Sequence, residues 1–193
     1  MIKIFFSIFI LFSLSTIYSC TPSGVLATGG ATTMVVAEGD RTLGTVVDDT
    51  TIKINISSNL LSSSTNLFVN VNTSVIEGRV LLTGIVDTQE IRIEAVRKVW
   101  EIDGVREVIN EIEIGDKTTI KEYANDLWIT TQVKGMAAKT IGLRALSYNF
   151  ETIKGKVYIA GITSKPEQLD QIIEVTKTIK GVKEIVNYVI IKE

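Results

Sequence analysis

Hydrophobic and polar residues follow the same pattern twice along this chain. With an offset of 77 residues and no gap, residues 48–114 align with residues 125–191. Three glycines of the first copy fall on glycines of the second, namely Gly78 on Gly155, Gly84 on Gly161 and Gly104 on Gly181. A repeat of this length can enclose a modest core, so we interpret it as a duplicated small domain and not as a solenoid repeat.

Each copy opens with a pattern that predicts an amphipathic helix. Apolar residues recur at helical spacing in both copies, at Ile52, Ile56 and Leu60 and at Ile129, Val133, Met136 and Ala137. Asp49 and Asp126 precede these residues, and we expect them to cap the two helices.

Alternating apolar residues then predict a hairpin of two strands in each copy. The strands carry Val69, Val71, Val75, Val80 and Leu82 in the first copy and Leu146, Tyr148, Phe150, Val157 and Ile159 in the second. Glu77-Gly78 and Lys154-Gly155 form the turns. Gly84 and Gly161 are expected to mark a bulge or a close approach by a helix.

A second helix and a last strand complete each copy. The helix begins near Asp87 or Ser164, where Pro166 occupies a position tolerated in a first turn, and it ends at Gly104 or Gly181. The last strand covers residues 105–114 or 182–191. Each copy therefore reads αββαβ, and we predict an α+β fold of two tandem domains, each a small mixed three-stranded sheet packed by two helices.

The N-terminus has the plan of a lipoprotein leader. One basic residue, Lys3, precedes an apolar run of about 15 residues, shorter than the ~20 that a spanning helix needs. We therefore expect a signal peptide at residues 1–19, lipidation at Cys20 and an arm at residues 20–47. The first domain is then expected at residues 48–115, a linker at 116–124 and the second domain at 125–193.

Composition argues against several classes of function. The chain has no histidine, and its one cysteine precedes the expected domains, so zinc sites and His- or Cys-centred catalysis have no residues to use. The carboxylate pairs Asp48-Asp49 and Glu111-Glu113 are explained by a helix cap and a solvated strand face. We expect no enzyme, no metal site and no cofactor.

Charge differs between the two copies. Residues 48–114 carry 6 Lys/Arg and 11 Asp/Glu, a net charge of −5, whereas residues 125–191 carry 9 and 6, a net charge of +3. The basic residues of the second copy alternate with acidic ones, and a secreted chain does not meet the nucleoid. Nucleic acid is therefore not an expected partner.

The two copies differ most clearly at the start of the first helix, where Thr50-Thr51 is replaced by Leu127-Trp128. Trp128 lies about 100° from the core residue Ile129 around a helix, off the face that packs inward. Lys134 and Lys139 follow on the same segment. A tryptophan beside lysines suits the surface of an anionic bilayer, which makes this segment a candidate lipid site.

Two other interpretations of this difference remain open. Leu127 and Trp128 would also suit packing between the two domains, and Trp100 of the first copy suits packing as well. Alternatively, the chain is a periplasmic adaptor that binds an envelope protein through Trp128 or through an apolar strand face formed by Val186, Tyr188 and Ile190.

The glycine turns, the αββαβ order and the two Gly-Val-x-x-Val/Ile-x-Asn endings of the units resemble the BON (bacterial OsmY and nodulation) domain. The leader and both opening segments, Asp40–Asp49 and Asn125–Thr131, resemble the family of outer-membrane lipoproteins with two BON domains. This resemblance implies a lipid-anchored, periplasm-facing monomer that binds anionic phospholipid and supports envelope integrity, with a role at division sites. Carried over by position, the phospholipid contacts are Leu127, Trp128, Thr131, Lys134 and Lys139.

Overall fold

The computed structural model describes residues 41–116 and 118–192 of the chain. The expected signal peptide at residues 1–19, Cys20 and the arm as far as residue 40 lie outside the described residues. Residues 43–47 of the expected arm and 120–124 of the expected linker are helical. Both long helices therefore begin earlier than the repeat itself.

The first domain contains three helices and three strands. In chain order these are α3 (Leu43–Ser63), α4 (Thr65–Asn70), β1 (Val71–Ile76), β2 (Arg79–Val86), α5 (Gln89–Trp100) and β3 (Glu107–Ile114). The strands form a sheet of order β1-β2-β3, in which β1 and β2 are antiparallel and β2 and β3 are parallel. The sheet is therefore mixed, as predicted.

The second domain repeats this arrangement. Its elements are α6 (Ile120–Ile141), the 3₁₀ helix η3 (Gly142–Ser147), β4 (Tyr148–Ile153), β5 (Lys156–Thr163), α7 (Pro166–Lys177) and β6 (Glu184–Ile191). The sheet order is β4-β5-β6, again with an antiparallel and a parallel pair. Pro166 stands in the first turn of α7, as predicted.

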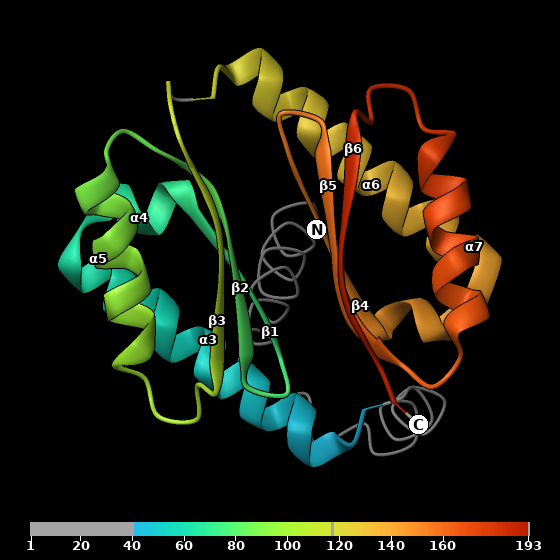
Figure 1. Cartoon of the computed structure of the whole chain (residues 1–193), viewed down its shortest axis with the longest axis horizontal. Helices are drawn as coiled ribbons and strands as arrows, with labels where there is room; N and C mark the ends of the chain where they lie inside the picture. Colours follow the sequence, from blue (N-terminus) through green and yellow to red (C-terminus); the bar gives the residue numbers. More distant parts are fainter. Residues whose placement is uncertain (1–40, 117, 193) are drawn as a thin grey trace, which may run out of the picture. The chain divides into compact units, whose positions relative to one another are not determined.

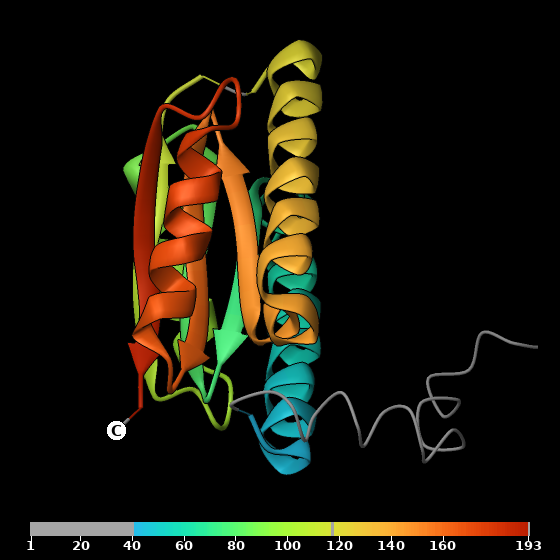
Figure 2. The same ribbon diagram turned by 90° about the vertical axis from the view of Figure 1, so that its right-hand side faces the viewer.

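Each sheet is covered on one face by its own two longer helices, α3 and α5 in the first domain and α6 and α7 in the second (Figure 1). Figure 2 shows α6 running along the sheet of the second domain. The helical residues predicted to be buried lie in the two cores, where Ile56, Leu60, Ile129 and Val133 are 0 to 1% exposed. The predicted α+β fold class is confirmed.

The prediction that Asp49 and Asp126 cap the first helices is wrong. Thr42 and Thr119 are the N-caps, seven residues earlier in each copy. Asp126 is 6% exposed within α6 and accepts hydrogen bonds from the backbone N–H groups of Lys154 (2.7 Å) and Gly155 (2.9 Å). Burial raises the pKa of this carboxyl, and the two backbone hydrogen bonds oppose that shift.

The first domain contains the same contact. Asp49 accepts hydrogen bonds from the N–H groups of Glu77 (2.8 Å) and Gly78 (2.9 Å), and it also pairs with Arg41. Glu77 has a positive φ of 51° in this turn, and Lys154 has one of 48°. In each domain, a buried aspartate of the first helix therefore accepts hydrogen bonds from two backbone N–H groups of the hairpin turn. These hydrogen bonds connect the helix to the turn and satisfy both N–H groups.

Two residues predicted to lie in strands are helical instead. Val69 belongs to α4, whose N-cap is Ser64, and Leu146 belongs to η3. These short helices end beside a glycine of the neighbouring strand: a Cβ on Gly84 would lie 2.0 Å from the carbonyl oxygen of Asn70. The predicted close approach of a helix at Gly84 is thus confirmed, and at Gly161 the approaching atom is the carbonyl oxygen of Ser147.

A third apolar cluster joins the two sheets. Its buried members are Ile76 and Leu81 of the first domain and Tyr158, Ala160 and Ile162 of the second. The strand face of Val186, Tyr188 and Ile190, which we expected to be available to a partner protein, packs against this cluster. The sequence alone could not predict that the first domain covers this face. Apolar residues alternate along a strand in the same way whether a second domain or another protein covers them.

Polar groups cross the same contact with complementary charge. Lys156 lies 3.1 Å from Glu113, Lys192 lies 2.5 Å from Glu77, and Tyr188 donates a hydrogen bond to Glu111. The hydrogen bond with Glu113 raises the pKa of Lys156. Some of the acidic residues of the first domain and basic residues of the second therefore pair with each other across the contact. Glu111 and Glu113 belong to this contact and do not simply face solvent.

Candidate functional site

The candidate lipid site lies along α6 between Leu127 and Lys139, and local sequence explains why this helix begins at Ile120. Thr119 and Glu122 make a capping box: the Thr119 hydroxyl accepts from the Glu122 N–H, and the Glu122 carboxylate accepts from the Thr119 N–H at 2.8 Å. This box satisfies two backbone donors at the helix start. The hydrogen bonds with Thr119 lower the pKa of Glu122.

The predicted site residues all lie on the exposed side of this helix. Leu127 is 55% exposed and Trp128 is 59% exposed, and Thr131, Lys134 and Lys139 are exposed as well. The hydroxyl of Thr131 donates to the carbonyl oxygen of Leu127 at 2.8 Å, which leaves it satisfied within the helix. α6 thus brings the five residues onto one outward surface.

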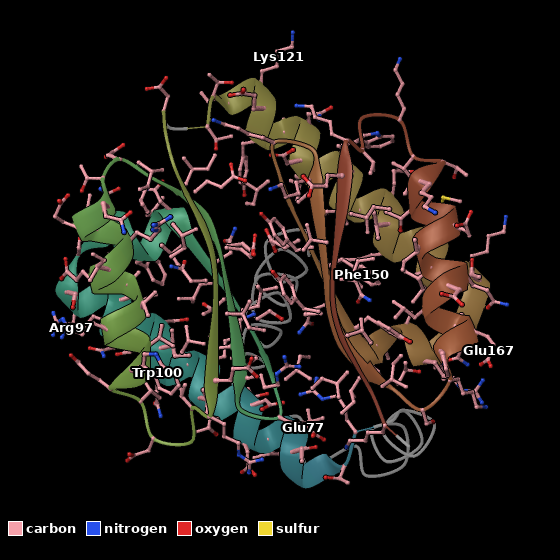
Figure 3. The ribbon with its side chains drawn as sticks, viewed as in Figure 1. Glu77, Arg97, Trp100, Lys121, Phe150 and Glu167 are labelled. Carbon is pink, nitrogen blue, oxygen red and sulfur yellow. The ribbon has the colours of Figure 1, made fainter. Side chains whose placement is uncertain are left out.

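The packing interpretation of the two tryptophans is not supported by their exposure. Trp128 retains more than half of its surface, and Trp100, at the end of α5, is 52% exposed. Figure 3 shows Trp100 and Arg97 at the surface of the first domain. Neither tryptophan is buried between the domains.

Leu127 also lines a groove of about 540 Å³ between α6 and the first domain. Its apolar walls include Val69 and Ile85 from the first domain and Ile120 and Tyr123 from α6. Leu127 and Trp128 therefore have different surroundings, although they are adjacent in sequence.

Sequence reasoning missed three exposed residues at the start of α6 because it assigned them to a linker. Ile120 is 90% exposed and Tyr123 is 64% exposed, and Lys121 extends away from the helix start in Figure 3. The signal that would have found them is the Thr-x-x-Glu capping box at residues 119–122. The exposed apolar and cationic side chains of α6 therefore begin at Ile120, seven residues before the predicted site.

Both basic and acidic groups lie beside the site. Glu151 on β4 accepts a hydrogen bond from Asn72 of the first domain at 3.1 Å. Burial raises the pKa of Glu151, whereas the nearby Lys134 and Lys53 lower it. Lys134 and Glu151 also line a smaller cavity of about 110 Å³.

The repeat supplies an internal comparison for this surface. At the positions of Leu127, Trp128 and Lys134, the first domain has Thr50, Thr51 and Ser57, and at the position of Lys139 it has Ser62. Two helices of the same fold thus present different outward chemistry. Of these two helices, only α6 carries the aromatic and cationic side chains at these positions.

No cluster of His, Cys, Asp or Glu suited to a metal ion occurs in the part of the chain that the structure covers. Within the same residues, no helix combines the length and hydropathy needed to cross a membrane.

Comparison with known proteins identifies both halves of the repeat. The family model of the BON domain matches residues 48–116 and again residues 125–193. A protein of Anaplasma centrale, named only by its place in the gshII 5′ region, is 37% identical over 147 residues, which cover 76% of this chain and 96% of that protein.

Two other relatives carry descriptive names. The outer membrane lipoprotein DolP of Haemophilus influenzae is 29% identical over 82% of each chain. The 21 kDa hemolysin of Actinobacillus pleuropneumoniae is 31% identical over 77% of this chain and 78% of its own. These matches confirm the predicted resemblance, and this chain, with two BON domains and a sequence similar to DolP, belongs to the BON domain family.

Proposed function

We propose that this chain is a non-catalytic envelope lipoprotein whose second BON domain contacts the surface of an anionic phospholipid bilayer through α6. The observation that carries the proposal is the exposure of Leu127 and Trp128, 55% and 59%, on a helix that also exposes Lys134 and Lys139. Similarity to an outer membrane lipoprotein supports the envelope location.

The physical basis is the match between this surface and the bilayer interface. A tryptophan ring is favoured at headgroup depth, where its apolar body and polar N–H both find suitable surroundings. Each lysine near an anionic surface contributes about 1 kcal/mol of attraction, which salt screens. Together these groups give a weak, salt-dependent contact.

The lipid anchor proposed at Cys20 makes a weak contact sufficient. An anchored chain stays near the bilayer, so the contact by α6 becomes a local event at high effective concentration. We expect a Cys20→Ser variant to leave the membrane fraction. Retention of that variant in the membrane at the wild-type level would contradict anchoring at Cys20.

Sedimentation with lipid vesicles tests the contact itself. The chain from Thr21 to Glu193 should bind vesicles containing anionic phosphatidylglycerol more tightly than vesicles of neutral phosphatidylcholine. Trp128→Ala should weaken this binding roughly tenfold, as expected for losing about 1.4 kcal/mol of apolar burial. Trp100→Ala is the matched control, since Trp100 is similarly exposed, at 52%, but lies on the first domain.

A test of Lys134 and Lys139 needs a control variant with the same change in net charge elsewhere on the second domain. Lys134→Glu with Lys139→Glu should weaken binding to anionic vesicles, and added salt should reduce the difference from wild type. Lys165→Glu with Lys180→Glu makes the same change in net charge at exposed positions flanking α7. Equal loss in both double variants, or equal loss in the two tryptophan variants, would contradict a lipid site on α6.

A further inference from the structure

The groove of about 540 Å³ between α6 and the first domain is apolar at one end and polar at the other. Its α6 side is a single row of residues at helical spacing, on the helix that Figure 2 shows along its length. Apolar side chains come first in this row and a lysine comes last: Ile120, Tyr123, Leu127, Thr130 and Lys134. On the opposite wall, the first domain adds the apolar Val69 and Ile85 and the amide of Asn72.

Strand β4 forms the floor of the groove and has the same change of polarity. The hydroxyl of Thr130 donates to that of Thr152 at 2.8 Å, which fixes the position of β4 beside α6. Glu151, before Thr152, lies near Lys134, and Ile153, after Thr152, lies toward the start of α6. The polar ends of the helix row and of the strand therefore coincide.

The polar groups in the middle of the groove already have partners within the protein. Both carboxylate oxygens of Asp126 accept from N–H groups of the hairpin turn, about 12 Å along the helix from Lys134. Covering this carboxylate and the Thr130 hydroxyl with apolar groups leaves their hydrogen bonds intact. A peptide, by contrast, would bring backbone N–H and C=O groups that need partners here.

The polar end of the groove continues into a second space. Asn72, Lys134 and Glu151 line both the groove and the cavity of about 110 Å³, so the two adjoin, and Lys53 of α3 lines the cavity as well. Burial raises the pKa of Glu151, whereas Lys134 and Lys53 lower it, so two ammonium groups act on one carboxylate. This end therefore has one positive charge in excess and suits a group with one negative charge.

The dimensions of the groove fit one lipid chain. Ile120 and Lys134 are 14 residues apart, which is about 21 Å along a helix. An acyl chain in a bilayer spans about 15 Å, half of the hydrocarbon thickness, so the row is long enough for one chain and the start of its head group. The volume also lies within the range of roughly 300–1,000 Å³ typical of small-molecule sites.

The corresponding row of α3 does not repeat this order. The first domain has Lys53 at the position of Thr130 and Ser57 at the position of Lys134. Its cation is thus in the middle of the row, where an acyl chain would have to desolvate it, and the end of the row has none. The order from apolar to cationic is therefore a property of α6 and not of the repeat.

We propose that this groove binds one molecule of a phospholipid that has a single acyl chain and an anionic head. The acyl chain lies along α6 from Leu127 toward Ile120, and the phosphate lies at Lys134, with Lys53 across the adjoining cavity. This binding goes beyond contact with a bilayer surface, since it encloses one lipid molecule and Trp128 is not among the residues that line the groove.

Equilibrium dialysis with radiolabelled palmitoyl lysophosphatidylglycerol, kept below its critical micelle concentration, tests the site. The chain from Thr21 to Glu193 contains every described residue and should bind one molecule per chain at saturation. Palmitoyl lysophosphatidylcholine has the same acyl chain but an added positive charge, and it should bind about tenfold more weakly. Glycerol phosphate, which lacks the acyl chain, should not compete.

A charge at the apolar end should prevent binding of the acyl chain. Val69 is 67% exposed on α4, so Val69→Asp should fold, and it should bind the lysolipid more than about tenfold more weakly. Ile93→Asp is the matched control, since Ile93 is 56% exposed on α5 of the same domain. Val69→Asp should sediment with anionic vesicles as wild type does, which separates this site from the bilayer contact of α6.

A second pair of variants tests recognition of the head group. Lys134→Gln should weaken binding of lysophosphatidylglycerol about tenfold, the usual effect of losing a hydrogen bond between charged groups. Lys180→Gln makes the same change in net charge at an exposed position after α7 and should bind as wild type does.

Absence of saturable binding by the wild type would overturn the proposal and would leave the groove to a partner of other chemistry, such as a peptide. Equal binding by wild type and Val69→Asp, or equal losses in Val69→Asp and Ile93→Asp, would also overturn it. Equal affinity for the anionic and the zwitterionic lysolipid would contradict recognition of the phosphate by Lys134 and Lys53. The vesicle result for Trp128→Ala bears only on the bilayer contact, so the two sites are tested separately.

Discussion

The hydroxyl of Tyr188 on β6 donates a hydrogen bond of 2.5 Å to the carboxylate of Glu111 on β3, joining the second domain to the first. Burial, followed by this hydrogen bond, raises the pKa of Tyr188 to about 12. The phenol therefore keeps its proton, and acts as a donor, over the whole physiological range. We expect this bond to stabilise the contact between the sheets.

Tyr188→Phe should lower the free energy of unfolding by about 1.5–3 kcal/mol, the usual loss for a hydrogen bond to a charged group. Urea unfolding measures this change. Tyr123→Phe removes a hydroxyl from a side chain that is 64% exposed, and it should change stability by less than about 0.5 kcal/mol. Equal stability of wild type and Tyr188→Phe would show that the hydrogen bond contributes nothing to folding.

Replacing either buried aspartate by asparagine, which has the same shape, should lower the free energy of unfolding. Asp126→Asn leaves one acceptor where two turn N–H groups need one each, so one of them loses its partner. We expect a loss of about 1–3 kcal/mol in the free energy of unfolding. Asp49→Asn should have an effect of similar size, whereas Asp170→Asn, on the exposed side of α7, should have almost none.

The glycine beside α4 cannot accept a side chain. Gly84 has φ of +134°, and its added Cβ would lie 2.0 Å from the Asn70 carbonyl oxygen. Gly84→Ala should therefore cost more than about 2 kcal/mol, through backbone strain and displacement of α4. Gly135, inside α6, has open space around it, so Gly135→Ala should instead stabilise by about 0.5–1 kcal/mol. Thermal unfolding of the two variants should shift in opposite directions.

The stability of the chain should depend on the ionisation of Glu151. Burial raises the pKa of this carboxyl above its ordinary value of 4.5. Between 4.5 and the raised pKa, the folded chain holds a proton that the unfolded chain releases, so this contribution to stability is complete below that window and lost as pH rises through it.

Glu151→Gln removes this titration but retains an acceptor for Asn72. The variant should therefore become more stable relative to wild type as pH rises through the window. Chemical unfolding of both proteins at a series of pH values measures the difference. Glu174→Gln, at an exposed position of α7, provides the control. A constant difference between Glu151→Gln and wild type, or one of opposite sign, would contradict the assignment.

Local patterns in the sequence were sufficient to predict the four longer helices, the hairpin turns and many residues of the two separate cores, but not the short helices α4 and η3. Ile56 and Val133 are buried because helical spacing aligns them with other apolar residues, and that spacing is visible in a short segment. Gly84 was also informative, since a glycine in an otherwise apolar strand indicates close approach.

The features that sequence reasoning missed depend on contacts between distant segments. Asp49 was assigned to a helix cap because its partners, Glu77 and Gly78, lie 28 and 29 residues away. Val69 alternates with Val71 as a strand would, yet the Ser64 cap and the space at Gly84 favour a short helix there. The exposed side chains of the candidate site were predictable because they were the positions where the two copies differed.

The contact between the sheets also restricts how this molecule can acquire new partners. Each sheet has helices on one face and apolar residues joined to the other domain on the opposite face, so substitutions on the strands disturb a core on either side. Outward positions of α3 and α6 carry no such constraint, and they are where the copies have diverged. A duplicated pair of this kind can therefore specialise one helix at a time, with the first copy exposing one chemistry and the second another, while the framework beneath them stays the same.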